Sequence, residues 1–453
     1  MGAMYYYDTL CAILPDGVRP VEGPALAPPT DFYDGFALPA HTTKPLEERD
    51  GPDTRLRFYE VPHVYTYDGV PLSTSVTSLA HQFETPFDGQ AAISMMTVSQ
   101  SQAWPRLEYV VYPSDGLDAW TCDQGALMTC QGRTVACVPP MSMAPGTTRS
   151  AVEQALRCLV VPRARVDGEV ELHTFARAMM PDEILRMWQR NGQRACNLGT
   201  DRHHLAECFF NGLPLRWWEE DMGALYDFCR VHLIPHGIVG HATEKEIVCW
   251  DADVAGSIDL IVWDPRQEVY HIVDYKRSDK LQGQLRGFGK MSAPFAHLDS
   301  CKGAGYALQL SIYQYILQRD YGMRIGERVL LSLHAEHPFV TSVPYLAAEV
   351  EHVMECRMAL TRARRAVAGA DPSLRCALTG APLVNAVRLS DGRVVMDAAA
   401  RVRDVDDAVP DEETRARFDE RVCAQLGSPP AFDASVTSWR RQMPAQGILP
   451  VFG

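Results

Sequence analysis

The chain has 453 residues, of which 46% are hydrophobic, so it is long and apolar enough for two or three domains with full cores. No run approaches the ~20 apolar residues of a membrane helix, and no charged-then-apolar leader opens the chain. We therefore expect an intracellular protein with no membrane partner. The formal net charge of −14 excludes a uniformly basic surface, although nucleic-acid binding depends on where Lys and Arg cluster.

The first third of the chain contains few chemical signals. Residues 1–57 are rich in proline without periodicity, which predicts an extended arm. Residues 58–72 read as a hairpin around Asp68-Gly69, and Ser75 marks the entrance of a helix, so residues 58–99 form a lead-in to the central part of the chain. Residues 100–178 combine short strand patterns with Pro-rich turns, which predicts an insertion or small β-rich subdomain.

Two helices are predicted after residue 178, and the second carries the first chemically informative residues. One covers residues 182–190, and the next begins at Asn197 or Thr200, both good N-caps. The second helix carries His203 and Glu207 four residues apart, hence on one face. The neighbouring His204 competes with His203 for any role as a metal ligand.

Three strand-like runs come next, and their polar residues fall at related positions. Glu244 and Glu246 share a face of the first run, whereas residues 254–263 and 269–273 form the next two strands around a turn at Asp264-Pro265. Because side chains alternate along a strand, Asp274 and Lys276 point the same way. Asp259, one strand over, can come level with Asp274 on that face.

Two carboxylates beside an amine suit the hydrolysis of a phosphodiester bond. Carboxylates bind Mg²⁺ or Mn²⁺, hard cations that prefer oxygen ligands, and a lysine can orient or help to deprotonate the attacking water. An isolated Asp-x-Lys is more often part of a solvated strand edge, so the flanking residues decide between the two interpretations. Downstream, a helix over residues 306–321 carries Gln309 and Tyr313 four residues apart, on one face.

Taken in order, these elements resemble the PD-(D/E)xK nuclease superfamily, and within it the RecB-like exonuclease branch. The resemblance rests on five short motifs between residues 180 and 340. They are Gly199-Thr200-x-x-His203, the strand acid Glu244 or Glu246, Gly256-x-x-Asp259, Asp274-Tyr275-Lys276 and Gln309-x-x-x-Tyr313.

The resemblance implies a role for each motif residue. Asp259 and Asp274 would be the main metal ligands with the backbone carbonyl of Tyr275, and His203 would bind the second of two ions. Lys276 would position the water and neutralise charge on the phosphate. Gln309 and Tyr313 would brace the site and touch the DNA strand. Glu244 is favoured slightly over Glu246 as the strand acid.

The cysteines bear on possible cofactors. The 13 cysteines are odd in number and include no Cys-x-x-Cys pair, which argues against a disulfide framework and a conventional zinc site. Several RecB-like nucleases carry an iron–sulfur cluster on closely spaced cysteines. Cys356, Cys376 and Cys423 are too dispersed for that pattern, so no cluster is expected and reduced, mostly buried thiols are.

A basic segment lies directly after the Asp-x-Lys motif. Its six basic residues outnumber Asp279 and Asp299, and Phe288 and Phe295 are interleaved with glycines. Such a loop is either an ordinary solvated loop or an element that grips a nucleic-acid strand, with rings that stack on unpaired bases. The basic residues are Lys276, Arg277, Lys280, Arg286, Lys290 and Lys302.

The predicted fold is α/β, with a restriction-endonuclease-like core in which helices flank a mixed central sheet. The core would cover residues 179–345, and residues 346–453 would form a helical and irregular C-terminal extension. The expected function is a DNA nuclease that uses two Mg²⁺ or Mn²⁺ ions and acts on single-stranded DNA or on a free end. The alternatives are an RNA endonuclease of the cap-snatching type and an inactive nuclease fold that serves as a DNA-binding scaffold.

Overall fold

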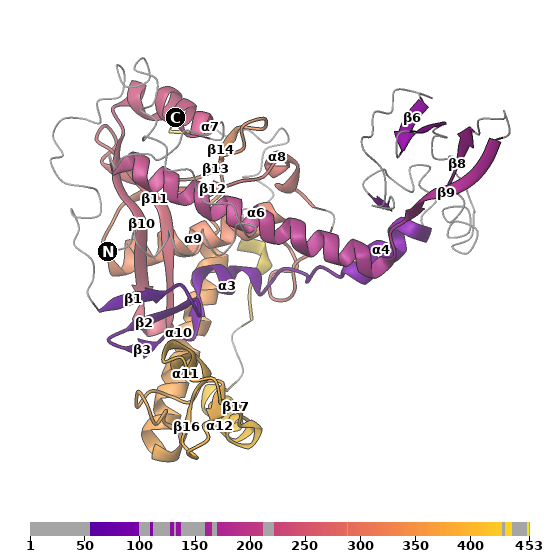
Figure 1. Cartoon of the computed structure of the whole chain (residues 1–453). Coiled ribbons are helices and arrows are strands. Elements are labelled where there is room, and N and C mark those ends of the chain that lie inside the picture. The colour runs from indigo at the N-terminus through magenta and orange to yellow at the C-terminus, as the bar shows by residue number, and fades with distance from the viewer. Residues whose placement is uncertain are drawn as a thin grey trace. The chain divides into compact units, whose positions relative to one another are not determined.

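The computed structural model describes ten stretches of the chain, and the arm predicted for residues 1–57 falls almost wholly outside them. The described residues divide into two compact units (Figure 1). One unit is built from residues 86–197, and the other from the residues before and after it. The described stretches are 55–98, 109–111, 127–130, 133–136, 159–164, 170–211, 222–287, 289–427, 431–436 and 451–452.

A six-stranded mixed sheet forms the centre of the larger unit. Its first three strands are antiparallel neighbours, the fourth is parallel to the third, and the fifth is antiparallel to the fourth. A short strand, β4 (Thr74–Ser75), pairs with the start of the second. The five main strands, in their order across the sheet, are β10 (Val239–Cys249), β11 (Val254–Asp264), β12 (Val269–Lys276), β13 (Ile325–Ser332) and β14 (Phe339–Ser342).

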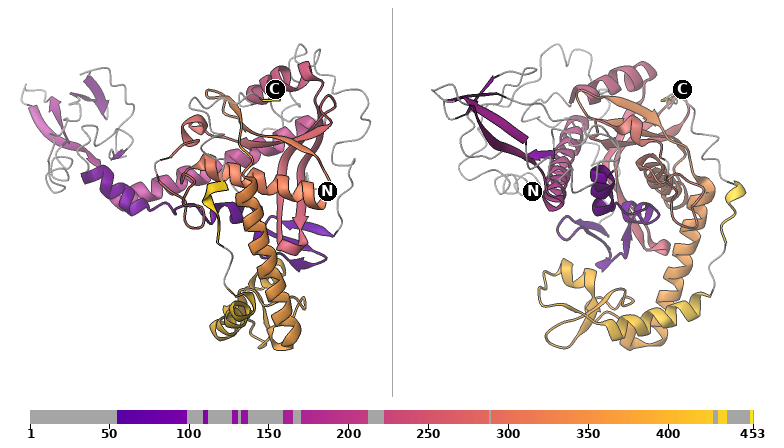
Figure 2. Two further views of the ribbon diagram at one scale, coloured as in Figure 1. Left: turned by 180° about the vertical axis from the view of Figure 1, so that it is seen from behind. Right: turned by 90° about the vertical axis from the view of Figure 1, so that its right-hand side faces the viewer.

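Helices cover both faces of this sheet (Figure 2). Because side chains alternate along a strand, Leu260 and Val273 join one apolar core, whereas Ile261 and Ile272 join the other. The first core contains the C-terminal part of α6 (Pro181–Phe210) together with α7 (Met222–Phe228). The second contains α3 (Val76–His81), α9 (Lys302–Asp320) and α10 (Ala347–Ala370). The protein is thus a mixed α/β protein with a mixed sheet flanked by helices, as the sequence predicts.

The helix that carries His203 differs from its prediction. The sequence predicts a new helix at Asn197 or Thr200, but α6 runs without interruption through both positions. The Asn197 side chain accepts a hydrogen bond from Gln193 Nε2 at 2.9 Å, one turn earlier, so it bonds along the helix instead of capping one. The prediction of two helices was therefore wrong.

The first part of the predicted lead-in, residues 58–85, contains a hairpin and a helix, whereas its last part, from residue 86 onward, belongs to the smaller unit. Asp68 and Gly69 have φ of 50° and 75° and connect two strands with a tight hairpin, and Ser75 Oγ accepts from Ser78 N at 3.1 Å to cap α3. A further strand begins at Leu56, inside the segment predicted as an arm. The three strands are β1 (Leu56–Tyr59), β2 (Val64–Tyr67) and β3 (Val70–Pro71).

The smaller unit contains a sheet within residues 100–178, where the sequence predicts an insertion or small β-rich subdomain, and helical residues on both sides of that range. A small apolar cluster of Ile93, Tyr109 and Ile184 links its helices to its sheet. The sheet has the order β5-β9-β8-β7-β6. Its elements are α4 (Gly89–Val98), β5 (Val110–Val111), β6 (Leu127–Cys130), β7 (Arg133–Ala136), β8 (Leu159–Ala164) and β9 (Val170–Ala178).

The region after α10 is more ordered than the helical and irregular extension that the sequence predicts. A three-stranded sheet and a helix enclose a separate core that includes Leu383, Val387, Val395 and Ala400. Its elements are β15 (Ala386–Arg388), β16 (Val394–Met396), α11 (Asp397–Val402), β17 (Val409–Pro410) and α12 (Glu412–Leu426). The remaining helical elements are α8 (Leu281–Gln284) and short turns at Cys229–Leu233, Ile234–His236, Trp250–Ala252, Pro372–Leu374 and Ala434–Val436.

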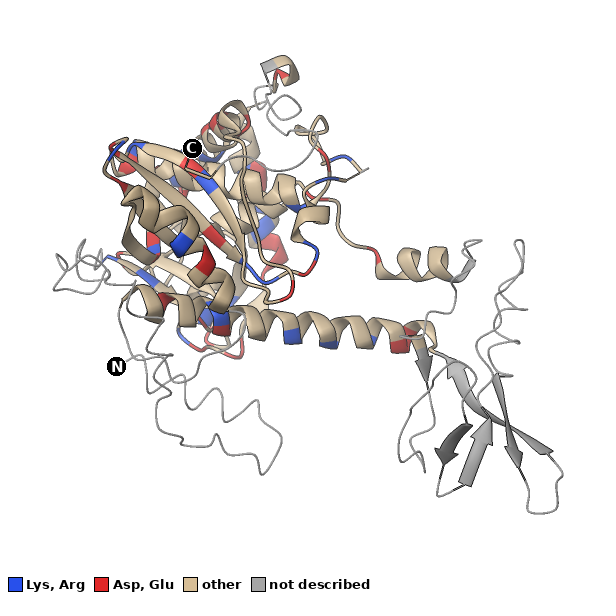
Figure 3. Ribbon diagram, turned by 90° about the horizontal axis from the view of Figure 1, so that it is seen from above, with Lys and Arg blue, Asp and Glu red and all other residues tan. Residues whose placement is uncertain are grey.

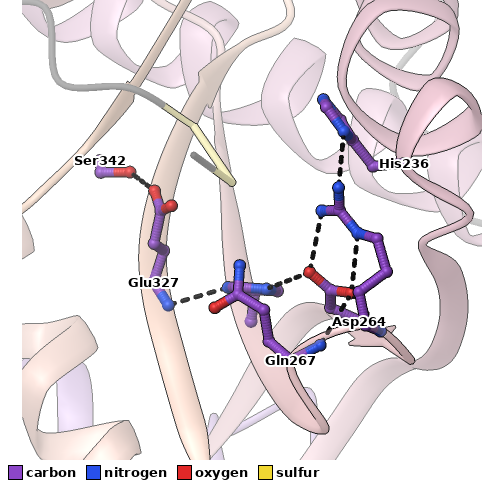
Figure 4. A network of polar contacts seen from close by, with 7 residues as sticks. His236, Asp264, Gln267, Glu327 and Ser342 are labelled. Carbon is purple, nitrogen blue, oxygen red and sulfur yellow. Dashed lines mark hydrogen bonds and ion pairs between the residues drawn. The ribbon is translucent and has the colours of Figure 1, made fainter.

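A polar network centred on the buried Asp264 stabilises the hairpin between β11 and β12 (Figure 4). Asp264 accepts from Arg266 N at 2.8 Å and from Arg266 Nη2 at 3.0 Å, and Arg266 Nη1 in turn lies 3.0 Å from His236 Nδ1. On the neighbouring strand, His271 Nδ1 accepts from Glu327 N at 2.8 Å.

Within the described residues, no helix combines the length and apolar character needed to cross a membrane.

Candidate active site

Three potential metal ligands from three elements converge in the larger unit. His203 comes from α6, Glu244 from β10 and Asp259 from β11. His203 Nδ1 lies 3.4 Å from Asp259 Oδ1 and 3.6 Å from Glu244 Oε1. One ligand atom from each residue falls within 4.8 Å of the other two, close enough for a single ion to contact all three.

Local backbone structure brings the two acids face to face. Thr243 pairs with Leu260 and Lys245 with Ile258, which sets Glu244 opposite Asp259 between them. Glu244 has a φ of 44°, a left-handed conformation that is uncommon for residues other than glycine and costs free energy. Such strain within a strand is typical of positions at functional sites.

Neighbouring groups orient both carboxylates. Ser257 Oγ donates to Glu244 Oε2 at 3.1 Å, which leaves Oε1 on the side of His203. Asp259 Oδ2 accepts from the backbone N–H of Tyr275 at 2.6 Å, so its Oδ1 faces the same histidine. The ring of Tyr275 meets the ring of His203 edge-on, with 5.6 Å between centroids. Each member of the group is therefore held by a second contact.

Asp274 and Lys276 form a separate pair next to this group. Asp274 is 3% exposed, and its Oδ2 lies 2.5 Å from Lys276 Nζ. The ammonium also lies over the ring of Tyr306, 4.9 Å from its centroid. The two side chains do point the same way, as the strand pattern predicts, but the carboxylate of Asp274 contacts the lysine and is outside the three-residue ligand group.

Gln309 and Tyr313 lie on α9 and are buried behind the site. Gln309 Nε2 donates to the Tyr313 hydroxyl at 3.4 Å, and the two residues are 6% and 2% exposed. A Cβ at Gly256 would lie 2.8 Å from Tyr313 Cε1, so the glycine admits the tyrosine ring against β11. The pair can brace the site, but it presents no surface to a nucleic-acid strand.

The electrostatic environment couples the charged groups. Burial disfavours protonation of His203, but Asp259 and Glu244 outweigh it and raise its pKa to about 10. Burial raises the pKa of Asp274 to about 6 and also raises that of Glu244. Burial alone would raise the pKa of Asp259, but the positive charges of His203 and Lys276 hold it below its usual range. The acids thus attract cations strongly, and a metal ion would have to displace the proton on His203.

The structure distinguishes between the alternatives that the sequence leaves open. Glu246 lies on the same strand as Glu244 but does not belong to the ligand group. His204 turns toward its own helix, where its Nδ1 lies 3.5 Å from Glu207 Oε2 and its Nε2 3.6 Å from Cys208 Sγ. Glu244 and His203 are therefore the members of each pair that face Asp259.

The basic segment after β12 is largely neutralised by acidic partners. Lys290 Nζ lies 2.6 Å from Asp299, and Lys302 Nζ lies 2.9 Å from Glu84. Lys280 lies 3.9 Å from the adjacent Asp279. Blue and red positions are interspersed along the ribbon in Figure 3.

The remaining residues of the segment divide by exposure. Arg286 is exposed and Arg277 half-buried. Phe295 is fully buried in the core around α9, so its ring is not available to stack on bases, which one of the two interpretations of this segment requires. Phe288 lies outside the described residues.

Two residues at the site are absent from the sequence prediction. Tyr306, under the lysine, lies three residues before Gln309 on the same helical face, a spacing that could have revealed it. Ser257, next to Gly256 in its motif, holds Glu244 through a contact between strands that no local pattern indicates.

Comparisons with protein-family models, with curated proteins and with solved structures found no match to this chain. The chemistry of the site is therefore argued from its own residues. One imidazole and two carboxylates form a mostly oxygen donor set without a thiolate, which could hold a metal ion.

Proposed function

We propose that the protein is a metal-dependent nuclease that hydrolyses phosphodiester bonds in DNA, and that His203, Glu244 and Asp259 form its metal centre. One observation carries the proposal: five short motifs, each weak alone, lie on a helix, three strands and a helix in chain order and meet at one place. That order supports a restriction-endonuclease-like core of the RecB-like type.

The residues divide the chemistry between them. His203, Glu244 and Asp259 would hold the ion, Mg²⁺ or Mn²⁺, which when bound supplies an activated water and stabilises charge on the phosphate. Lys276 brings a positive charge that can balance the developing negative charge on the phosphate oxygens. Gln309 and Tyr313 keep the α9 side of the site closed to water.

DNA is the proposed substrate because the RecB-like motifs favour it, and attack from a free end follows from the same likeness. An RNA endonuclease of the cap-snatching type would also combine a histidine, acids and a lysine. The Gln309-x-x-x-Tyr313 helix packs against the site and favours the DNA branch. An inactive scaffold has no need for a strained Glu244 aligned with Asp259 and His203.

The test is cleavage of end-labelled single-stranded DNA, double-stranded DNA and RNA in Mg²⁺, Mn²⁺ or EDTA. We expect metal-dependent cleavage of DNA, lost in Asp259→Asn and Lys276→Ala. Glu246→Gln is the matched control, because it removes a carboxylate from the same strand as Glu244 but outside the ligand group, and it should cleave like the wild type.

Several outcomes would contradict the proposal. Cleavage that persists in EDTA or in Asp259→Asn would show that the activity does not come from this centre. Cleavage of RNA alone would favour the cap-snatching alternative. DNA binding without cleavage in any metal would favour the scaffold. Product lengths would separate processing from an end from internal cutting.

A further inference from the structure

A cavity of about 220 Å³ lies at the far end of the β10–β11 hairpin from the candidate active site. Trp250 and Asp253 line it, six residues along their strands from Glu244 and Asp259. At about 3.3 Å per residue, this spacing places the cavity roughly 20 Å from the metal ligands. The other walls come from β3, α10, β16 and residues between 379 and 384. The cavity is therefore separate from the site already described.

One face of α10 brings three guanidinium groups to this region. Four residues follow the spacing i, i+4, i+7 and i+8, which places them on one side of the helix: Arg357, Thr361, Arg364 and Arg365. The last three line the cavity, and Arg357 lies one turn earlier. The side chains of Arg357 and Arg364 are only 14% and 18% exposed, so water screens their charges little.

Carboxylates neutralise only part of this charge. Asp253 Oδ2 lies 3.9 Å from both Arg357 Nη2 and Arg364 Nη1, beyond hydrogen-bond distance. Both guanidinium groups instead donate to the neutral hydroxyl of Ser73, at 2.8 and 3.2 Å. Asp419 also attracts Arg364, but it is exposed to screening by solvent. Burial lowers the pKa of Arg357 to about 10 and lowers that of Arg364, because Asp253 offsets the lost solvation only in part.

Two further groups at the cavity lack an acidic or polar side-chain partner. The Arg365 guanidinium lies over the Trp250 ring, 4.4 Å from its centroid, and donates to the Trp250 backbone oxygen at 2.9 Å. Thr361 is 3% exposed, and within the described part of the chain its hydroxyl has no hydrogen-bond partner. A buried hydroxyl without a partner costs free energy, so a ligand that accepts from it would supply the missing bond.

We propose that this cavity binds a phosphomonoester, with the phosphate against Arg364, Arg365 and the Thr361 hydroxyl. The three guanidinium groups exceed the single nearby carboxylate of Asp253 by two positive charges. A phosphomonoester carries a charge of about −1.5 to −2 at pH 7 and can balance that excess, whereas a carboxylate or a phosphodiester carries only one negative charge. The planar fork of an arginine also matches the geometry of phosphate oxygens.

The remaining walls indicate the body of the ligand. Val70, Pro71 and Pro382 present apolar surface beside the indole of Trp250. Sites that enclose a whole drug-sized ligand measure about 300–1,000 Å³, so this cavity takes the phosphate and part of the body. A nucleoside monophosphate combines a phosphomonoester with a flat base that can lie against such walls.

The same phosphate chemistry occurs on a free nucleotide and at the phosphorylated end of a strand. An end held in the cavity would lie roughly 20 Å from the metal ligands, too far for cleavage at that end. The free nucleotide is therefore the assigned ligand. The inference goes beyond the proposed function and does not depend on the metal centre.

The experiment titrates the full chain by calorimetry in EDTA with deoxyadenosine monophosphate (dAMP), inorganic phosphate or deoxyadenosine. One dAMP should bind per chain, inorganic phosphate should displace it, and deoxyadenosine should not bind. Asp259→Asn should bind dAMP like the wild type, because the cavity is separate from the metal centre. Absence of dAMP binding, or equal affinity for deoxyadenosine, would overturn the proposal.

Substitutions at Thr361 test the buried hydroxyl with little change in shape. Thr361→Val should bind dAMP about tenfold more weakly, because it loses a hydrogen bond to a charged group. The same variant without ligand should melt no lower than the wild type, since the unpaired hydroxyl is gone. Thr361→Ser keeps the hydroxyl and should bind dAMP as the wild type does. Wild-type affinity in Thr361→Val would overturn the placement of the phosphate.

A pair of arginine variants separates the cavity from general attraction by positive charge. Arg365→Gln should bind dAMP at least about tenfold more weakly, because it loses a charged hydrogen bond to the phosphate. Arg362→Gln is the matched control, since it removes the same charge from an exposed position of α10 outside the cavity, and it should bind like the wild type. Equal losses in the two variants would overturn the site.

Competition with short strands distinguishes the two sources of phosphate. A DNA strand with a 5′-phosphate should displace dAMP less effectively than free dAMP does. Displacement at lower concentration by that strand, and not by the same strand without its 5′-phosphate, would overturn the assignment to a free nucleotide. Binding of dAMP by a protein that cleaves no nucleic acid would sink only the nuclease proposal, whereas DNA cleavage without dAMP binding would sink only this one.

Discussion

His271 should make the stability of the core depend on pH in a defined window. The residue is 1% exposed, and its Nδ1 accepts from Glu327 N, so the proton of the neutral ring is on Nε2, 3.9 Å from Asp264. Burial lowers the pKa of His271 to about 4, although Asp264 pulls it upward. The folded protein therefore keeps this ring neutral well below the pH at which an unfolded chain protonates it.

The sign and size of the effect come from that difference. An unfolded histidine has a pKa of about 6.5, so as the pH falls below 6.5 the unfolded state binds a proton that the native state refuses. The stability is complete above pH 6.5 and decreases until the pH reaches about 4. Each pH unit costs about 1.4 kcal/mol of unfolding free energy, so about 2 kcal/mol should be lost by pH 5 from this group alone.

The measurement is urea unfolding at pH 7.5, 6.0 and 5.0 for the wild type and for His271→Gln. Between pH 7.5 and 5.0, the wild type should lose about 2 kcal/mol more than the variant, because the amide of glutamine does not titrate. The control is His337→Gln at an exposed position, which should follow the wild type. Parallel pH curves for wild type and His271→Gln would refute the reasoning.

Three further substitutions probe packing around the core. Gly256→Ala places a methyl group 2.8 Å from Tyr313 Cε1 and should cost about 1–3 kcal/mol of stability through overpacking. Gly199→Ala, with nothing within 4 Å, should instead stabilise α6 by about 1 kcal/mol, and a thermal melt of both variants would check the contrast. Phe452→Ala removes a buried ring that packs on Phe228 and His271 and should cost about 3 kcal/mol, measured by urea unfolding; an unchanged midpoint would show that the ring is not part of the core.

The sheet and much of the site can be predicted from local patterns. The short apolar runs on either side of the Asp264-Pro265 turn predict two paired strands, and the structure has them as β11 and β12. Strand periodicity also places Asp274 and Lys276 on one face, where they form an ion pair. Such predictions succeed because each depends on residues a few positions apart.

The errors involve contacts between distant parts of the chain. Phe295 looks like a loop aromatic in its local sequence, but Phe83 and Phe432 pack against its ring at 4.7 and 5.2 Å and bury it. Similarly, nothing near Asn197 indicates that helix continuation outweighs its preference for a cap, a difference of about 1 kcal/mol that packing elsewhere easily overcomes. Local sequence also does not indicate that Asp259 joins the ligand group whereas Asp274 pairs with Lys276, because both contacts depend on the tertiary structure.

The left-handed backbone of Glu244 lowers the stability of the fold at a position whose carboxylate the proposed activity requires. A glycine there would adopt the same φ without a steric penalty, and an asparagine would do so more easily than a glutamate, so either exchange should relax the strand. Either exchange would also remove a carboxylate from the proposed metal centre. Selection for thermal robustness alone would therefore favour loss of this glutamate, and its retention under such selection would have to come from the chemistry that it performs.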